Sequence, residues 1–150
     1  MDLKIKKLHP DAKLPTKNYE SDACFDLYSV EDIIIDPGEI VIISTGIAIE
    51  IPNSYVGFIW DRSGLGSKGI HRLAGVIDCD YRGEVKIVLA NVNIMDFIEN
   101  EQSYYYRYKI DNGDKIAQLF IQKVEPFKIV EVKKLSETER GKKGWGSSGR

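Results

Sequence analysis

Short β-branched segments separated by turn residues decide the fold class of this sequence. Ile33–Ile35 runs into an Asp-Pro-Gly turn at 36–38, and residues 40–44 form the next apolar segment. An Asn-Gly pair at 112–113 predicts a hairpin-type turn, and residues 127–132 form the last predicted strand. No apolar stripe of helical period exceeds two turns. Strands of about four to eight residues at roughly ten-residue spacing are typical of an all-β sandwich, barrel or jelly roll.

Length and composition fit one globular domain. With 150 residues, of which 43% are hydrophobic, the chain can bury roughly two-thirds of its unfolded surface in a single core. The formal net charge of −2 offers no polybasic patch for nucleic acid or anionic lipid. No apolar run exceeds four residues, which excludes a transmembrane helix. We therefore expect neither a nucleic-acid nor a membrane partner.

Two features predict the compartment. Residues 1–7 are basic but have no apolar region of the kind found in secretory signals. Cys24 and Cys79 are too few for a disulfide scaffold and are predicted to be reduced thiols. We expect an intracellular protein of the cytoplasm, with the nucleus as the alternative, rather than a secreted one.

Four polar, glycine-containing stretches interrupt the strand pattern and are candidates for chemistry. The first places Asp26 among apolar neighbours, as an exposed carboxylate on a half-buried strand or as a functional one. The second contains Arg62, Ser63 and Gly64. A guanidinium fork, a hydroxyl and backbone N–H groups freed by glycine suit an anion pocket. A tight turn with a solvated arginine has the same composition.

The third and fourth stretches lie further along the chain. Residues 74–84 have a polar tip between two apolar half-strands, which predicts a β-hairpin. On a strand, Asp78 and Asp80 share a face, and such a pair can bind a divalent ion or supply a general base. A surface turn with two aspartates is the plain alternative. Residues 113–119 form a turn that enters a strand, where Gln118 faces either a ligand or water.

The C-terminal residues differ from the rest of the chain. Residues 136–150 include four glycines, three serines and one tryptophan, Trp145. This composition cannot bury enough apolar surface to order itself, and a large side chain between two glycines makes a poor linker. We predict an all-β domain over residues 1–135 and a flexible arm over residues 136–150 that carries one large contact residue.

Taken in order, these stretches resemble the five motifs of the homotrimeric dUTPases, the deoxyuridine triphosphate nucleotidohydrolases. The resemblance runs from Ala23 to Gly149, and the wording is closest in residues 75–83 and 113–119. The arm sequence from Arg140 to Gly149 matches the last motif. Five motifs in the expected order at suitable spacing form a far more specific pattern than any one alone.

The resemblance implies a distorted jelly-roll barrel and a homotrimer with exchanged C-terminal arms. Each active site of the family draws on three subunits. Motifs one, two and four come from one chain, motif three from a second and the arm from a third. The implied reaction converts dUTP and water to dUMP and pyrophosphate with Mg²⁺, which limits uracil in DNA and supplies dUMP for thymidylate synthesis.

The family roles carry over to individual residues of motif three. Asp78 is implied as the general base that activates a water for in-line attack on the α-phosphorus. Tyr81 is implied to lie flat on the deoxyribose and to exclude a 2′-hydroxyl group. The implied partners of the uracil edge are the backbone of Gly75, Val76 and Ile77 and the side chain of Lys86.

The other motifs are implied to bind the phosphates, the metal and the face of the base. Asp26 is implied to hold Mg²⁺ through a coordinated water, which suits an ion that keeps much of its hydration. Trp145 is implied to stack over the uracil when the arm closes. The implied phosphate contacts are Arg62, Ser63, Gly64 and Gln118 from the barrel, and Arg140, Gly146, Ser147 and Ser148 from the arm.

Several positions depart from the family pattern. Cys24 stands where the first motif usually has glycine, and Trp145 replaces the usual phenylalanine of the arm. Ser148 replaces a threonine, and Arg72 precedes the third motif where a small or amide side chain is less intrusive. The stacking role of the arm survives the change to tryptophan, because the indole offers more area.

Two alternatives remain open from the sequence. The related dCTP deaminases place a catalytic glutamate about ten residues after the aspartate of motif three, and Val88 stands there in this chain. A non-catalytic nucleotide-binding jelly-roll module shares the β architecture but needs neither Asp78 nor the arm. Ammonia release from dCTP distinguishes the first alternative from dUTP hydrolysis.

Overall fold

A computed structural model describes residues 1–93, 97–98, 101–102 and 106–144. Four of the predicted site residues, Trp145, Gly146, Ser147 and Ser148, lie outside the described residues. The elements in chain order are β1 (Lys4–Lys7), β2 (Phe25–Tyr28), β3 (Ile33–Ile35), β4 (Ile40–Glu50), β5 (Tyr55–Trp60), α1 (Ser63–Gly66), β6 (Ile70–Leu73), β7 (Val76–Ile77), β8 (Glu84–Asn91), β9 (Phe97–Ile98), β10 (Glu101–Gln102), β11 (Tyr108–Ile110) and β12 (Lys115–Lys123).

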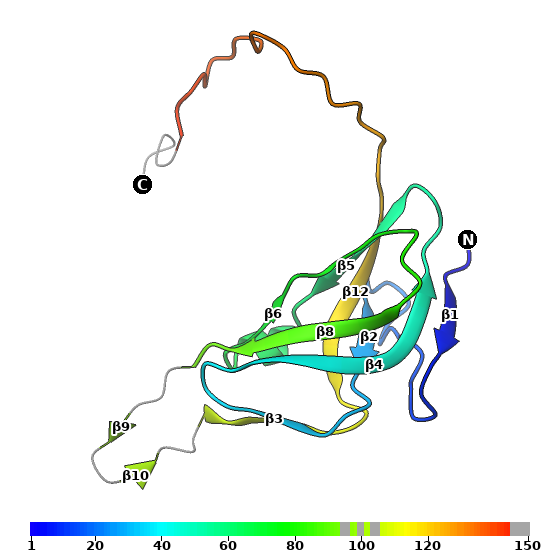
Figure 1. Ribbon diagram of the computed structural model, residues 1–150, viewed down its shortest axis with the longest axis vertical. Helices are drawn as coiled ribbons and strands as arrows, with labels where there is room; N and C mark the ends of the chain where they lie inside the picture. Colours follow the sequence, from blue (N-terminus) through cyan, green and yellow to red (C-terminus); the bar gives the residue numbers. More distant parts are fainter. Residues whose placement is uncertain (94–96, 99–100, 103–105, 145–150) are drawn as a thin grey trace.

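Two four-stranded antiparallel sheets form the body of the molecule (Figure 1). One has the strand order β1-β4-β8-β6 and the other the order β2-β12-β5-β7. Two further two-stranded ladders, β11-β3 and β10-β9, are separate from these sheets. The predicted all-β architecture is therefore confirmed. Among the described residues, α1 is the only α-helix, and no helix is long and apolar enough to span a membrane.

The core forms where the alternating faces of the two sheets meet. In β12, Ala117 and Leu119 are fully buried, whereas Gln118 between them lies on the other face. The same alternation buries Ile87 and Leu89 of β8. Successive side chains of a strand point to opposite faces, so one face of each strand supplies the core and the other remains available for a site.

Two predicted hairpins are wrong as strand pairs. Gly113 adopts a φ of 90° in the predicted turn, but this turn joins β11, which pairs with β3, to β12, which pairs with β2 and β5. Likewise β7 pairs with β5, through Gly57 and Ile77, and β8 lies in the other sheet. Residues 75–83, called the 75–83 loop below, therefore cross from one sheet to the other.

The predicted strand over residues 127–132 is also wrong for this chain. After β12 ends at Lys123, no strand forms in residues 124–144, which leave the barrel as an extended segment (Figure 1). Phe127 is 88% exposed and Ile129 is 97% exposed. The apolar pattern is present, but a strand needs a partner for its backbone groups, and the described part of the chain offers none here. The domain boundary at residue 135 stays a prediction.

Candidate functional site

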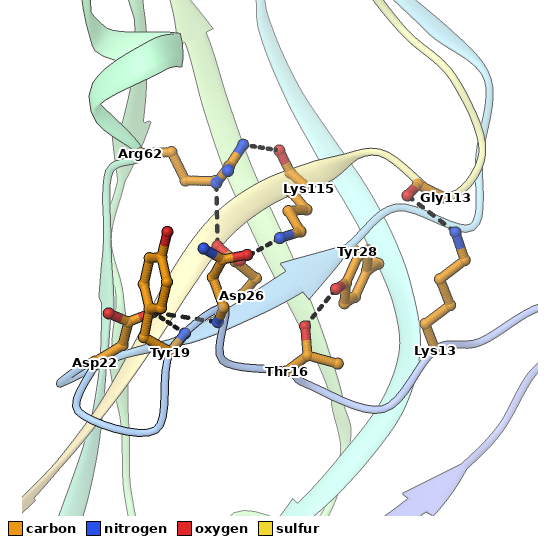
Figure 2. A network of polar contacts seen from close by, with 10 residues as sticks. Lys13, Thr16, Tyr19, Asp22, Asp26, Tyr28, Arg62, Gly113 and Lys115 are labelled. Carbon is orange, nitrogen blue, oxygen red and sulfur yellow. Dashed lines mark hydrogen bonds and ion pairs between the residues drawn. The ribbon is translucent and has the colours of Figure 1, made fainter.

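One group of predicted site residues lies side by side on the sheet β2-β12-β5. Gln118 of β12 is opposite Asp26 of β2 on one side and Trp60 of β5 on the other. Arg62 is the second residue after β5 and reaches back over the sheet to Asp26 (Figure 2). Antiparallel pairing thus brings together residues from three of the predicted motifs.

Asp26 is the buried centre of this group. Its residue is only 6% exposed, and each carboxylate oxygen faces a cation (Figure 2). Arg62 Nε lies 3.1 Å from Oδ1, and Lys115 Nζ lies 2.7 Å from Oδ2. Burial alone raises the pKa of Asp26, but the hydrogen bond from Lys115 and the charge of Arg62 outweigh it and lower the pKa. The carboxylate is therefore ionised.

The charges of this cluster do not cancel. Asp26, Arg62 and Lys115, called the cationic cluster below, carry two positive charges and one negative. A cavity of about 400 Å³ lies against Arg62, Gly64 and Lys115 and also includes Lys68. Ser63 and Gly64 are exposed at the start of α1, beside this cavity. The excess positive charge and the open hydroxyl suit a phosphate group.

A second group of predicted residues lines a different cavity. This cavity has a volume of about 410 Å³ and is formed mainly by the 75–83 loop and the start of β8. Its lining includes all six residues predicted for the base, the sugar and the attacking water: Gly75, Val76, Ile77, Asp78, Tyr81 and Lys86. None of these six also lines the cavity beside the cationic cluster. The described chain thus divides the predicted site into two groups.

Tyr81 is held in the loop by packing on glycine. Its hydroxyl donates to the Glu84 backbone carbonyl at 2.9 Å. A Cβ at Gly83 would lie 2.6 Å from Tyr81 Cζ, so the ring occupies space that only glycine leaves open. The backbone N–H of Tyr81 donates to the Asp78 carbonyl at 3.1 Å and closes the turn. The aromatic face is thereby fixed at the wall of the cavity.

The two charged side chains of this cavity differ in their surroundings. Lys86 Nζ lies 3.7 Å from a Glu84 carboxylate oxygen. Asp78 is exposed, and its carboxylate has no hydrogen bond or ion pair within the described ranges. Because no protein donor occupies its oxygens, this carboxylate can accept a hydrogen bond and then a proton from a bound water. A general base needs such a free acceptor.

Arg140 is not brought to either group. It lies on the exposed segment beyond β12, where its Nε donates to the Lys143 carbonyl at 3.2 Å. Its predicted contact with a phosphate therefore stays a prediction, as do the contacts of the four arm residues that lie outside the described ranges.

The structure adds residues that the sequence analysis missed. Lys115 pairs with Asp26 across β12 and β2, although Gln118 was the only site residue predicted in that motif. Asp61 pairs with His71 and also accepts the Arg72 backbone N–H. An acidic residue in one motif and a basic residue at the edge of another could have suggested the first pair. The contacts of Asp61 could not have been predicted, because they depend on β5 ending beside β6.

The side chains present set limits on a metal site. Within the described residues, no group of three or more His, Cys, Asp or Glu side chains could hold a metal ion. Each oxygen of Asp26 already accepts from a cation but retains a second lone pair. Asp26 therefore fits contact with a metal through a bound water better than direct coordination.

The chain combines an all-β fold with a cationic cluster and with a separate cavity that holds a free carboxylate. These features are typical of proteins that bind anionic small molecules. Comparison with known proteins narrows this class. The sequence profile of the dUTPase family matches residues 10–149. This chain belongs to the dUTPase family.

Individual relatives support the same assignment. The chain is 43% identical to a deoxyuridine 5'-triphosphate nucleotidohydrolase of Corynebacterium diphtheriae, over 97% of this chain and 91% of the relative. It is 45% identical to the protein of that name from Nautilia profundicola, over 100% of both chains.

Solved structures confirm the fold. A mutant of the dUTPase of Staphylococcus bacteriophage 80alpha, with dUpNHpp, superposes with a TM-score of 0.90 at 32% identity over 99% of both chains. The dUTPase of phage phi11 gives a TM-score of 0.82 at 28% identity, over 92% of this chain and 100% of that one. The predicted jelly-roll fold is confirmed, whereas exchange of the arms stays a prediction.

Proposed function

We propose that this protein hydrolyses dUTP to dUMP and pyrophosphate. One observation carries the proposal: the six residues predicted for base, sugar and attacking water line a single cavity, and the Asp78 carboxylate in it is free. The names of the relatives, and dUpNHpp in the phage structure, support the same substrate. In a cell, this reaction limits uracil in DNA and supplies dUMP for thymidylate synthesis. Location in the cytoplasm stays a prediction.

The loop cavity suits the nucleoside part of dUTP. Backbone N–H and C=O groups at Gly75, Val76 and Ile77 can pair with the uracil edge, and Lys86 adds a donor. A cytosine edge would leave these groups unpaired once the bound base covers them, which penalises the wrong base. The Tyr81 ring is fixed against Gly83, and we propose that it packs on the deoxyribose and excludes a 2′-hydroxyl group.

Asp78 activates the attacking water in this proposal. The water oxygen forms a bond to the α-phosphorus while the bond from that phosphorus to the bridging oxygen of pyrophosphate breaks. The proton of the water passes to the Asp78 carboxylate. Proton transfer by a positioned group of this kind contributes about 10²–10⁴-fold to the rate.

The cationic cluster binds the triphosphate. Arg62 and Lys115 neutralise phosphate charge, and Asp26 keeps the two cations in place. The exposed Ser63 hydroxyl, the Gly64 backbone and the neighbouring Gln118 add hydrogen bonds. Asp26 would hold Mg²⁺ through a bound water, and the ion would supply positive charge to the pyrophosphate leaving group.

The C-terminal arm completes the site. We propose that Trp145 stacks over the uracil and that arm residues contact the outer phosphates. Closure of the arm excludes water other than the nucleophile. The arm residues proposed for these phosphate contacts are Arg140, Gly146, Ser147 and Ser148.

We further propose a homotrimer with shared sites. The two groups of site residues line separate cavities in one chain, which supports assembly of each site from different subunits. Exposed apolar surface supports the same conclusion. Ile42 of β4 and Leu73 of β6 are exposed, and both pair with the half-buried Val88 of β8. Residues 124–135 are exposed throughout.

Pyrophosphate release from dUTP, dCTP, dTTP and UTP tests the reaction. We expect turnover of dUTP and rejection of the other three, since each lacks the base or sugar that the loop cavity fits. Ammonia release from dCTP favours the deaminase alternative instead. Binding of dUTP without turnover favours the non-catalytic module.

Subunit exchange tests the shared site. Asp78→Asn trimers are mixed with trimers that lack residues 141–150, each inactive alone. We expect activity to return after exchange, because a mixed trimer contains sites with an intact Asp78 from one chain and an intact arm from another. Lack of recovery despite verified exchange shows that each chain holds a self-contained site. A monomeric wild-type protein that still hydrolyses dUTP contradicts the trimer.

A further inference from the structure

The chain crosses between the two sheets through two consecutive residues with positive φ. Ala74 has a φ of 60° and Gly75 a φ of 122°. Glycine adopts such angles readily, but alanine does so at a cost, because its Cβ crowds the backbone. Both residues line the loop cavity. Something outside the crossing must stabilise the conformation of Ala74.

Arg72 provides that contact. Its Nη1 donates to the Ala74 carbonyl, and its guanidinium carbon lies 5.2 Å from the centroid of the Trp60 ring. A planar guanidinium can donate in its plane and stack on a ring at the same time, which a lysine ammonium cannot do. Arg72 Nε is buried without a hydrogen-bond partner in the described ranges. The Arg72 side chain is thus held by one hydrogen bond, to the Ala74 carbonyl, and by contact of its guanidinium face with the Trp60 ring.

Asp61 fixes the backbone from which Arg72 extends. Its Oδ1 accepts the Arg72 backbone N–H at 2.7 Å, and its Oδ2 lies 2.6 Å from His71 Nδ1. On the far side of the crossing, the Gly75 carbonyl accepts the Ile59 backbone N–H at 2.8 Å. The end of β5 therefore holds the crossing from both sides.

We propose that Arg72 is a positioning residue for recognition of the base. It holds Ala74 in the left-handed conformation, and this fixes the backbone of Gly75–Ile77 that lines the cavity. The proposal rests on the proposed function, since it concerns the uracil site of that reaction. A loosened crossing widens the cavity, so binding of the base and exclusion of a 5-methyl group weaken while proton transfer at Asp78 persists.

Arg72→Met and Arg72→Lys test the proposal, with Lys4→Met as a control for loss of one surface charge. Lys4 pairs with Glu50 at an exposed edge, and it does not line the loop cavity. We expect Arg72→Met to raise KM for dUTP about tenfold and to lower the preference for dUTP over dTTP by a similar factor. We expect kcat to change much less, Arg72→Lys to be intermediate, and Lys4→Met to match the wild type.

Ala74→Gly separates positioning from general stability. Glycine adopts a positive φ without the cost that alanine carries. In the Ala74→Gly background we therefore expect Arg72→Met to raise KM only about twofold to threefold. An equal or larger loss in that background, or an unchanged KM and selectivity in Arg72→Met alone, overturns the proposal.

Fluorescence makes the result independent of turnover. The chain has two tryptophans, so Trp145→Phe leaves Trp60 as the single indole reporter. We expect Arg72→Met in this background to increase quenching of Trp60 by acrylamide, because the guanidinium no longer covers the ring. Unchanged quenching shows that the contact does not exist and overturns the proposal. Failure of the wild type to hydrolyse dUTP defeats the proposed function. In that case, acrylamide quenching of Trp60 and the Kd for dUMP, measured in the same variants, still decide whether Arg72 positions the loop.

Discussion

The two groups of site residues are held in place by different forces. The cationic cluster depends on ion pairs that join Asp26 of β2 to Lys115 of β12 and to Arg62. The 75–83 loop depends on backbone hydrogen bonds, on glycine and on the packing of Tyr81. Substitutions in the cluster should therefore change stability together with activity. Substitutions in the loop should change recognition or chemistry and leave stability nearly unaffected.

Asp78→Asn tests the loop side with the largest expected effect. The amide keeps the shape of the side chain but cannot accept the proton of the water. We expect turnover to fall about 10²–10⁴-fold, with the free energy of unfolding within about 0.5 kcal/mol of the wild type, since the carboxylate has no partner to lose. Rates of pyrophosphate release and thermal unfolding measure the two quantities. Undiminished turnover excludes Asp78 as the base.

Asp26→Asn tests the cluster side. It leaves Arg62 and Lys115 close together without the carboxylate that compensates them. Both cations are partly exposed, 31% and 33% for their side chains, so we expect a loss of about 2 kcal/mol rather than the larger cost of a fully buried pair. Turnover should fall as well, because the cations are no longer held for the phosphates.

Asp111→Asn is the matched control for this change. Asp111 pairs with Lys109, and both side chains are more than half exposed, 56% and 65%. An exposed pair contributes about 0–1 kcal/mol, so denaturant unfolding should barely change. Equal destabilisation by the two variants contradicts the idea that burial gives the cluster its structural role.

Much of the fold and of the site could be predicted from the sequence. Alternation in β12 predicted that Gln118 lies on the face opposite the core, and the motif order predicted that Arg62 and Asp26 belong to one site. The first inference needs only the period of a strand, whereas the second rests on the resemblance to the dUTPase motifs. The grouping of residues around Asp78 was likewise implied by that resemblance.

Other features depend on strand pairing, which a local pattern does not determine. The 75–83 region has the pattern of a hairpin, yet β7 pairs with β5. Lys115 reaches Asp26 because β12 pairs with β2. Arg72 reaches Trp60 because β6 lies beside the end of β5. The apolar alternation in residues 127–132 predicts a strand, but a strand also requires a partner that the described chain does not supply.

Gly83→Ala sharpens the loop side of the comparison with a smaller expected effect. The new Cβ requires the Tyr81 ring to move, since Cζ lies only 2.6 Å from its position. We expect about a tenfold rise in KM for dUTP and weaker rejection of UTP. Gly66→Ala is the control, because a Cβ there meets no atom within 4 Å. Steady-state kinetics with both nucleotides should show no change for the control.

The smallest expected effect is the pH dependence that the cluster adds to stability. The pKa of Asp26 is lowered from its ordinary value of 3.8, so the folded state favours the ionised form. A lowered folded-state pKa contributes stability that is present above the unfolded value and is lost as pH falls through the folded value. The pKa of Lys115 is raised from 10.5, chiefly by its hydrogen bond to Asp26, so its contribution is lost as pH rises through the raised pKa.

Asp26→Asn should therefore flatten both ends of the stability profile. We expect the difference in unfolding midpoint between wild type and variant to shrink as pH falls from about 5 to about 3. It should also shrink as pH rises above the ordinary lysine value of 10.5. If the difference in unfolding midpoint is constant across the whole pH range, the pair of Asp26 and Lys115 does not stabilise the fold through its charges. The cluster and the loop then differ only in how their side chains pack.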